Sequence, residues 1–192
     1  MDADGLTFAC ATSAEERVAR RLGLRTVRIG VSVANGVPAE PVVSFGLAGG
    51  LGDVRVGDVL DATRVVDESG QTLWEGPGLG IRGARPATML GGEVLVHDVA
   101  ERRRLREASG ADAVDMESGT LARAGRLAGV LRAVSDDAGS AMEGVDGTVH
   151  PDGRTDVAGL LRWIVTRRGD AVRAMRDALA ALHALEKAVA TS

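Results

Sequence analysis

Short runs of β-branched and other apolar residues recur through the first two thirds of the chain, separated by segments rich in Gly, Pro and Asn. Such runs are typical of strands, because branched side chains suit a pleated, half-buried surface. Strands are expected over residues 27–33, 42–45, 59–66, 113–116 and 130–134. Residues 64–75 are typical of a hairpin whose turn contains Gly70, since glycine supplies the positive φ that such turns need.

Between several of these runs, apolar residues recur at every third or fourth position, which is the spacing of one helix face. Helices are expected over residues 14–22, 99–108 and 117–128. A further amphipathic helix, over about 170–189, is expected to pack on the body of the protein. Its apolar positions are Val172, Met175, Leu179, Leu182 and Leu185. Strands mixed with helices predict the α/β fold class.

The length of 192 residues predicts one domain spanning residues 1–192. The net charge of −4 provides no global positive field, which argues against nucleic acid as a partner. A single cysteine, Cys10, excludes an internal disulfide and a CxxC motif, and the three histidines lack metal-ligand spacing, so no metal is expected. No apolar run approaches the ~18 residues of a membrane span, and the acidic start lacks the basic region of a signal peptide. A cytoplasmic location is therefore expected.

Glycines follow directly on the apolar run at 42–45, within residues 46–52. Because glycine has no Cβ, a ligand can approach the backbone N–H groups closely, which suits a phosphate or a sugar. A tight turn is the alternative. A second cluster, residues 78–83, formally matches GxGxxG, but no strand precedes it and Pro86 follows, so a dinucleotide site is rejected.

Acidic residues stand where two of the predicted strands end. Asp115 and Glu117 follow one strand, and Asp136 follows the strand at 130–134. Ligands of α/β proteins bind in the crevice outside the carboxyl ends of strands, so we expect Glu117 and Asp136 to end neighbouring strands and to share one cleft. There one carboxylate can hold sugar hydroxyls while the more desolvated one donates a proton. Ordinary helix-start acids, favoured by the helix dipole, are the alternative.

The start of the first predicted helix fits a capping box of Ser13 and Glu16. Glu15 shares a helix face with Val18 and Leu22, so it is expected to point toward the body of the protein. An inward carboxylate beside a cleft suits a general base. Glu15 is therefore preferred to Glu16 for that role, and Glu16 remains the alternative.

Three segments stand in a specific order along the chain: residues 45–50 with 56–59, then Val-Asp-Met-Glu-Ser at 114–118, then Arg-Ala-Val-Ser-Asp at 132–136. Together they resemble the nucleoside phosphorylase/nucleosidase superfamily. Residues 151–157 and the Arg-rich terminal helix are most similar to the hopanoid-associated phosphorylases, a group assigned the removal of adenine from adenosylhopane. The resemblance covers roughly residues 6–188.

This resemblance implies a three-layer α/β/α sandwich around a central mixed β-sheet, and cleavage of the N-glycosidic bond of a purine nucleoside with release of adenine from an adenosylhopane-like substrate. It implies that Glu117 binds the ribose hydroxyls and that Asp136 protonates N7 of the base. Glu15 or Glu16 would activate water. The further residues implied to contact the substrate are Met116, packed against the sugar, Ser135, which holds the base or the aspartate, and Phe45, Gly46, Ala48 and Gly49.

The resemblance implies no cofactor, although inorganic phosphate would be a co-substrate in a phosphorolytic variant. Hydrolysis and phosphorolysis are both left open. A homodimer is expected by analogy, and the terminal helix offers a peripheral contact with membranes for an enzyme whose substrate is dissolved in them.

Three features depart from the superfamily pattern. Leu47 stands where the nucleosidase branch often carries a hydroxyl residue, and residues 34–41 are a short turn where relatives usually have a helix. Aromatic residues are scarce, leaving Phe8, Phe45 or Trp74 to stack on adenine. These departures keep two alternatives open: a methylthioadenosine/S-adenosylhomocysteine- or futalosine-type nucleosidase, and a nucleoside-binding protein of the same fold with reduced catalysis.

Overall fold

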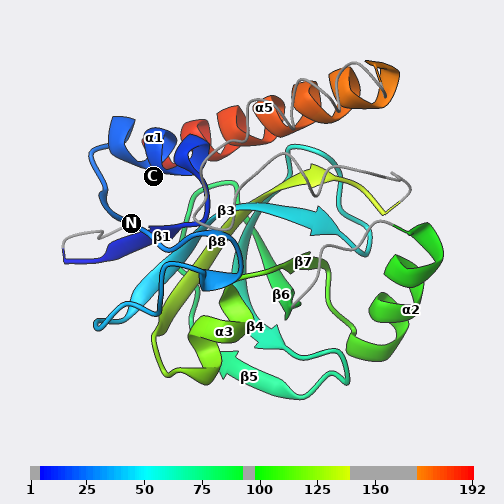
Figure 1. Cartoon of the computed structure of the whole chain (residues 1–192), viewed down its shortest axis with the longest axis horizontal. Coiled ribbons are helices and arrows are strands. Elements are labelled where there is room, and N and C mark those ends of the chain that lie inside the picture. The colour runs from blue at the N-terminus through cyan, green and yellow to red at the C-terminus, as the bar shows by residue number, and fades with distance from the viewer. Residues whose placement is uncertain (1–4, 93–97, 139–167) are drawn as a thin grey trace.

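A computed structural model describes residues 5–92, 98–138 and 168–192 (Figure 1). Its strands are β1 (Thr7–Cys10), β2 (Arg25–Arg28), β3 (Val42–Gly50), β4 (Val59–Val66), β5 (Thr72–Glu75), β6 (Arg85–Gly91), β7 (Ala113–Asp115) and β8 (Leu127–Asp136). Its helices are α1 (Ser13–Arg21), the short 3₁₀ turn η1 (Val31–Val33), α2 (Val99–Ser109), α3 (Ser118–Arg123) and α5 (Arg168–Ala190).

All of these strands belong to one mixed sheet, which confirms the α/β class. β3 runs parallel to β1 and β8, while β8 is antiparallel to β4. β4 pairs with β6, β6 with β7, and β7 again with β3, so these pairings close a ring. β2 and β5 extend the sheet outside that ring. The strict three-layer sandwich stays a prediction.

Side chains from β3 and β8 alternate between two apolar cores, as the period of two in a strand requires. Val43, Phe45 and Leu131 enter a core that also contains Leu185 of α5 and Val18 of α1. Their neighbours Val42 and Val130 enter a second core, which Leu121 of α3 also joins. Figure 1 shows α1 and α5 lying together along one side of β3 and β8.

The terminal helix α5 confirms the predicted amphipathic pattern only in part. Leu182 and Leu185 are buried against the sheet, as expected. On the preceding turns, the described residues leave three apolar side chains exposed: Val172, Met175 and Leu179.

Two predicted elements end well before the expected residue. The helix expected over 117–128 ends at Arg123, because the chain turns at Gly125 (φ +66°) and Leu127 begins β8 beside Val42. The strand expected over 27–33 ends at Arg28 and is followed by η1. In both segments the local pattern of apolar residues fits a helix as well as a strand, and strand pairing within the fold decides between them.

The predicted hairpin is confirmed, with Val65 of β4 opposite Trp74 of β5. β6 was not expected, because its sequence, Arg-Pro-Ala-Thr-Met-Leu-Gly, contains a proline and one β-branched residue. β3 is longer than predicted, since it continues through the glycines to Gly50.

Candidate active site

Arg132 lies in the middle of β8 and is almost completely buried, with 1% of its surface exposed. Its Nε donates to Oδ2 of Asp115 (2.9 Å), and its Nη2 donates to Oε2 of Glu117 (3.0 Å). Nη2 also donates to Oγ of Ser44 (2.6 Å). Nη1 lies 3.9 Å from Oε1 of Glu15. A buried charge must be paired, and here three carboxylates share one guanidinium.

Glu15 reaches this cluster from the first turn of α1. Its Oε1 accepts the N–H of Leu47 (2.9 Å), which lies within the glycine-rich strand β3. Its Oε2 accepts the Thr12 N–H (2.8 Å) and the Thr12 hydroxyl (3.0 Å), while the Glu15 N–H donates to Oγ of Thr12 (3.3 Å). Thr12 is thus the N-cap and Glu15 completes the capping box. The predicted box of Ser13 and Glu16 is wrong by one residue, because Ser13 is already helical.

Glu16 faces a different environment. Its Oε1 accepts from Nη2 of Arg20 (2.6 Å), and its Oε2 accepts from Nε of Arg28 (2.8 Å). The structure therefore separates the two candidate bases. Glu15 lies beside Arg132, whereas Glu16 forms ion pairs with Arg20 and Arg28.

Asp115 and Glu117 flank the turn from β7 into α3. Oδ1 of Asp115 accepts the N–H groups of Glu117 (3.2 Å) and Ser118 (2.9 Å) and thereby caps the helix. The alternative of a helix-start acid is right for Asp115, although its other oxygen contacts Arg132. Glu117 is free of that task, since its own side chain makes no capping bond.

The carboxyl of Glu117 is buried between charges of both signs. Its Oε1 accepts the Ser32 N–H (3.1 Å) from η1. Burial raises the pKa of Glu117 to about 7, because desolvation, together with Asp115 and Glu15, outweighs the lowering effect of Arg132. The carboxyl with the raised pKa is thus the one that the resemblance assigns to the sugar, which differs from the expectation that the more desolvated acid donates the proton.

Gly46 of β3 lies directly against the cluster. It is the register partner of Arg132 and has a φ of +153°. A Cβ at this position would stand 2.1 Å from Oε1 of Glu15 and 2.8 Å from Nη1 of Arg132. The glycine is needed here because the Glu15 carboxylate occupies the space that a side chain would fill.

Asp136 is the last residue of β8, and it lies beside a different part of β3 from Arg132. A register shift between Ala48 and Gly49 brings Asp136 opposite Gly49 and leaves Ser135 as the extra residue. The Ser135 hydroxyl donates to Oδ1 of Asp136 (2.8 Å) and lies 3.3 Å from the Ala48 carbonyl. Oδ2 of Asp136 accepts from Arg102 of α2, which is 3% exposed.

Glu117 and Asp136 do not end neighbouring strands, which corrects that part of the prediction. β3 lies between β7 and β8 because it pairs with both. Arg132, which holds Glu117, is paired with Gly46, and Asp136 is paired with Gly49. Three residues of strand correspond to about 10 Å. The two acids therefore belong to two stations along one strand.

The remaining residues of the predicted site differ in their exposure. Met116, Ser135 and Gly49 are half-buried, whereas Ala48 and Gly46 are buried. Phe45 is fully buried and packs edge-to-face on Phe8, with ring centroids 5.8 Å apart. Because the Phe45 and Phe8 rings are enclosed in the core with α5, neither offers a face for stacking on adenine.

The sequence-based hypothesis assigned no role to Arg132, Arg102 or Thr12. Arg132 had a usable signal, because a charged residue within a run of strand-forming apolar residues requires buried partners. Arg102 had none that separates it from Arg103 and Arg104 beside it.

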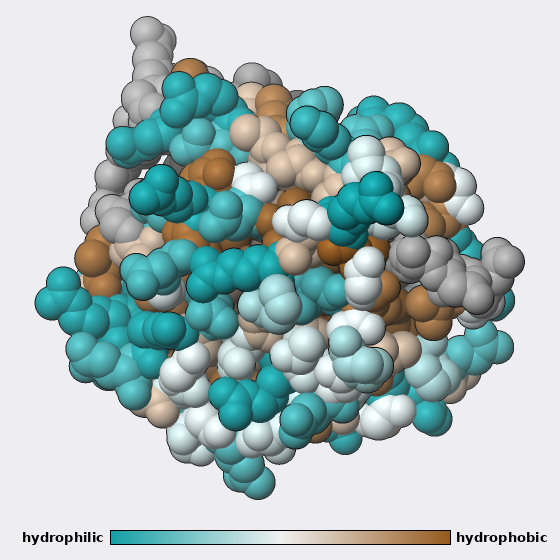
Figure 2. All heavy atoms as spheres, turned by 180° about the vertical axis from the view of Figure 1, so that it is seen from behind, coloured by the Kyte–Doolittle hydropathy of each residue, from teal (hydrophilic) through white to brown (hydrophobic). Residues whose placement is uncertain are grey.

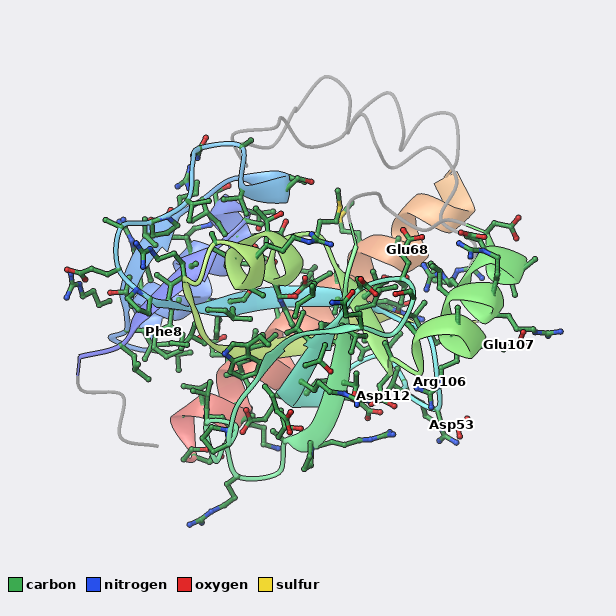
Figure 3. All side chains as sticks on the ribbon, turned by 90° about the horizontal axis from the view of Figure 1, so that it is seen from below. Phe8, Asp53, Glu68, Arg106, Glu107 and Asp112 are labelled. Atoms are coloured by element: carbon green, nitrogen blue, oxygen red, sulfur yellow. The ribbon has the colours of Figure 1, made fainter. Side chains whose placement is uncertain are left out.

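Outside this site, charged side chains pair near the surface. Arg106 and Asp112 form an ion pair of 3.2 Å, and Figure 3 shows them near Asp53 on the side of α2. Seen from behind, the described surface is mostly polar with apolar residues in small groups (Figure 2). Within residues 5–92, 98–138 and 168–192, no cluster of three His, Cys, Asp or Glu side chains suits a metal ion. No helix in those ranges is long and apolar enough to cross a membrane.

Comparison with solved structures identifies the fold. The chain superimposes on Helicobacter pylori 5′-methylthioadenosine/S-adenosyl homocysteine nucleosidase with a TM-score of 0.59 and 14% identity, covering 95% of this chain and 94% of that one. Arabidopsis thaliana 5′-methylthioadenosine nucleosidase gives 0.56 and 17%, covering 97% and 92%. The chain has the fold of these nucleosidases. Helicobacter pylori futalosine hydrolase gives 0.53 and 13%, covering 91% and 96%. No family model and no curated protein matches the sequence.

Proposed function

We propose that this protein cleaves the N-glycosidic bond of a purine nucleoside and releases adenine from an adenosyl-bearing substrate of the adenosylhopane type. The observation that carries the proposal is the pair of stations on β3, with Glu15 and Glu117 gathered on Arg132 at Gly46 and Asp136 at Gly49. We assign the ribose to the station at Gly46 and the base to the station at Gly49. The shared fold with nucleosidases supports it.

The station at Gly46 is suited to the sugar. When the glycosidic bond breaks, positive charge develops on the ribose, and an excess of carboxylates over cations stabilises that charge. Glu117, in its ionised form, accepts hydrogen bonds from the ribose hydroxyls. Arg132 and the Ser32 N–H hold its two oxygens in place.

Glu15 serves as the general base that activates a water molecule. Its carboxylate is oriented by Thr12 and by the Leu47 N–H, so it is fixed before substrate arrives. Glu15, Asp115 and Glu117 together surround Arg132, and this excess of negative charge disfavours a bound phosphate. We therefore propose hydrolysis rather than phosphorolysis.

Asp136 serves as the general acid that protonates the leaving purine. The oxygen of water attacks C1′ and passes its proton to Glu15, while the bond from C1′ to N9 breaks and its electrons move onto the purine. The leaving purine takes a proton at N7 from Asp136. Such general acid catalysis contributes about 10²–10⁴-fold.

The test is chromatographic detection of free base from a panel of adenosyl and inosyl nucleosides with different 5′ groups, with and without inorganic phosphate. We expect adenine release that is independent of phosphate. Glu15→Gln and Asp136→Asn should each lower kcat by about 10²-fold or more. Glu16→Gln and Asp137→Asn are the matched controls and should retain activity.

Absence of base release from every nucleoside, with nucleosides still bound, would favour the alternative of a binding protein. Release of hypoxanthine alone would favour the futalosine-type alternative. Loss of activity in Glu16→Gln but not Glu15→Gln would reverse the assignment of the base. The homodimer and the peripheral membrane contact stay predictions.

A further inference from the structure

Arg102 is a second buried arginine, and it comes from a helix that the proposed reaction does not otherwise use. Its Nη1 donates to the Gly50 carbonyl (3.2 Å) of β3 and to the Asp137 carbonyl (2.9 Å) beyond β8. Its Nη2 donates to Oδ2 of Asp136. The guanidinium thus joins α2 to the ends of β3 and β8. Its planar donors hold the Asp136 carboxylate in one orientation.

The two oxygens of Asp136 have different partners. Oδ2 faces Arg102, which donates hydrogen bonds and cannot accept them. Oδ1 faces the Ser135 hydroxyl, which can both donate and accept. The Ser135 hydroxyl has a second acceptor within 3.3 Å, the carbonyl of Ala48. It can therefore turn from Oδ1 to that carbonyl when Oδ1 carries a proton.

We propose that Arg102 is a positioning residue that directs the acid proton of Asp136 to Oδ1. This inference rests on the proposed function. A proton on Oδ2 would oppose the N–H of Arg102, so the acid form keeps Oδ2 as an acceptor and carries its proton on Oδ1. As the bond from C1′ to N9 breaks, that proton passes to N7 of the purine. The Asp136 carboxylate that remains is stabilised by Arg102 and by the returning Ser135 hydroxyl, and it is reprotonated from solvent.

Dependence on the leaving group separates this role from a purely structural one. A purine needs a proton in order to leave, whereas 4-nitrophenolate, as the leaving group of 4-nitrophenyl β-D-ribofuranoside, does not. A residue that acts through Asp136 affects only the purine. A residue that merely supports the fold affects both substrates alike.

The experiment compares kcat and KM of wild type, Arg102→Met and Arg102→Lys on adenosine, or on the best purine substrate of the panel, and on the nitrophenyl riboside. We expect Arg102→Met to lower kcat on the purine by about 10²-fold while KM changes little. Its rate on the nitrophenyl riboside should stay within about threefold of wild type. Arg102→Lys retains a cationic donor and should recover about 10-fold of the purine loss. Arg106→Met, on the same helix but at the surface pair with Asp112, is the control and should match wild type.

Equal losses on the two substrates, or an Arg102→Met variant as active as wild type on the purine, would overturn the inference and leave the proposed function standing. Inactivity of the wild type on both substrates would overturn the proposed function and this inference with it. Circular dichroism verifies that each variant is folded. If Arg102→Met does not fold, Arg102→Lys decides alone: we expect a loss of about 10-fold confined to the purine, and a loss shared by both substrates contradicts the proposal.

Discussion

Two buried arginines organise the two stations of the candidate site, and the carboxylates around them are arranged differently. Arg132 is shared by Glu15, Asp115 and Glu117. Within residues 5–92, 98–138 and 168–192, Arg102 forms an ion pair with Asp136. The first region therefore gathers three carboxylates around one buried cation, whereas in the second an arginine holds the carboxylate of Asp136.

This difference separates stabilisation of charge from orientation of a group. Burial, together with the neighbouring carboxylates, disfavours the charged form of Glu117 in the free protein, as its raised pKa indicates. Under the proposed function, these carboxylates become favourable when a cationic sugar develops beside them. The contact of Arg102 with Asp136 instead fixes the position of one carboxylate, because the planar guanidinium donors set its geometry. Substitutions in the two regions should accordingly change the free energy of unfolding and the activity by different amounts and in different directions.

The largest expected effect comes from removing the shared cation. Arg132→Met leaves three carboxylates buried without compensation, so the free energy of unfolding in urea should fall by about 3–5 kcal/mol. Arg106→Met, which breaks an ion pair near the surface, should cost at most about 1 kcal/mol. Equal costs for the two substitutions would contradict the interpretation that Arg132 neutralises a buried cluster.

Glu117→Gln tests how the buried negative charge affects activity and the free energy of unfolding. Activity should fall by about 10²-fold, because a neutral amide stabilises the cationic sugar poorly. The native pKa of Glu117, about 7, lies above the ordinary value of 4.5, so the folded state retains the proton more strongly between these values. The contribution of Glu117 to the free energy of unfolding therefore falls as pH rises from about 4.5 to 7.

The variant lacks this titration, so its stability relative to wild type should increase between about pH 5 and pH 8. Urea unfolding at both pH values provides the measurement. Glu75→Gln, at an exposed position of β5, is the control and should show no such trend. A wild-type advantage that grows with pH would contradict the assigned direction.

Alanine at the two glycines compares the stations directly. At Gly46 the new Cβ would stand 2.1 Å from Oε1 of Glu15, and the shift it forces should cost about 1–3 kcal/mol and reduce activity. At Gly49 the nearest atom, Oδ2 of Asp136, is 3.2 Å away, so the cost should stay below about 1 kcal/mol. Thermal unfolding of both variants measures the difference, and a larger cost at Gly49 would break the comparison.

The smallest expected effect concerns the helix cap that holds Glu15. Thr12→Ala should cost about 1 kcal/mol of stability, since it removes the capping hydroxyl and one bond to Oε2 of Glu15. Ser13→Ala should change stability by less than about 0.5 kcal/mol. The reverse order, measured by urea unfolding, would restore Ser13 as the cap.

Local patterns were sufficient for the elements whose signals are strong. β4 has the predicted bounds, residues 59–66, because apolar residues stand at both ends of the run and the turn that contains Gly70 follows it. The proximity of Glu15 to the cluster also follows from its helix face. The predicted end of the helix after Glu117 failed, since the place of Leu127 depends on pairing with Val42 of β3 and not on its neighbours in sequence.

The two arginines mark the limit of what a sequence pattern can indicate. Which carboxylates meet Arg132 depends on the ring of strands, whose contacts join residues far apart in the chain. The bulge that brings Asp136 opposite Gly49 depends on how β8 pairs with β3, and this pairing joins residues far apart in the chain. Chemically important residue types were visible, but their partners were not.

One short segment, η1, holds two consecutive non-glycine residues in the left-handed region, Ser32 at φ +52° and Val33 at φ +61°. Each such residue costs on the order of 1–3 kcal/mol, and the Ser32 amide reaches Glu117 from this turn. This turn is therefore strained, and a backbone with ordinary φ values would point the Ser32 amide away from Glu117. Under the proposed function, binding of the ribose depends on this backbone conformation. Exchanging the loop for one with ordinary φ values should therefore weaken ribose binding even though no acidic residue has changed.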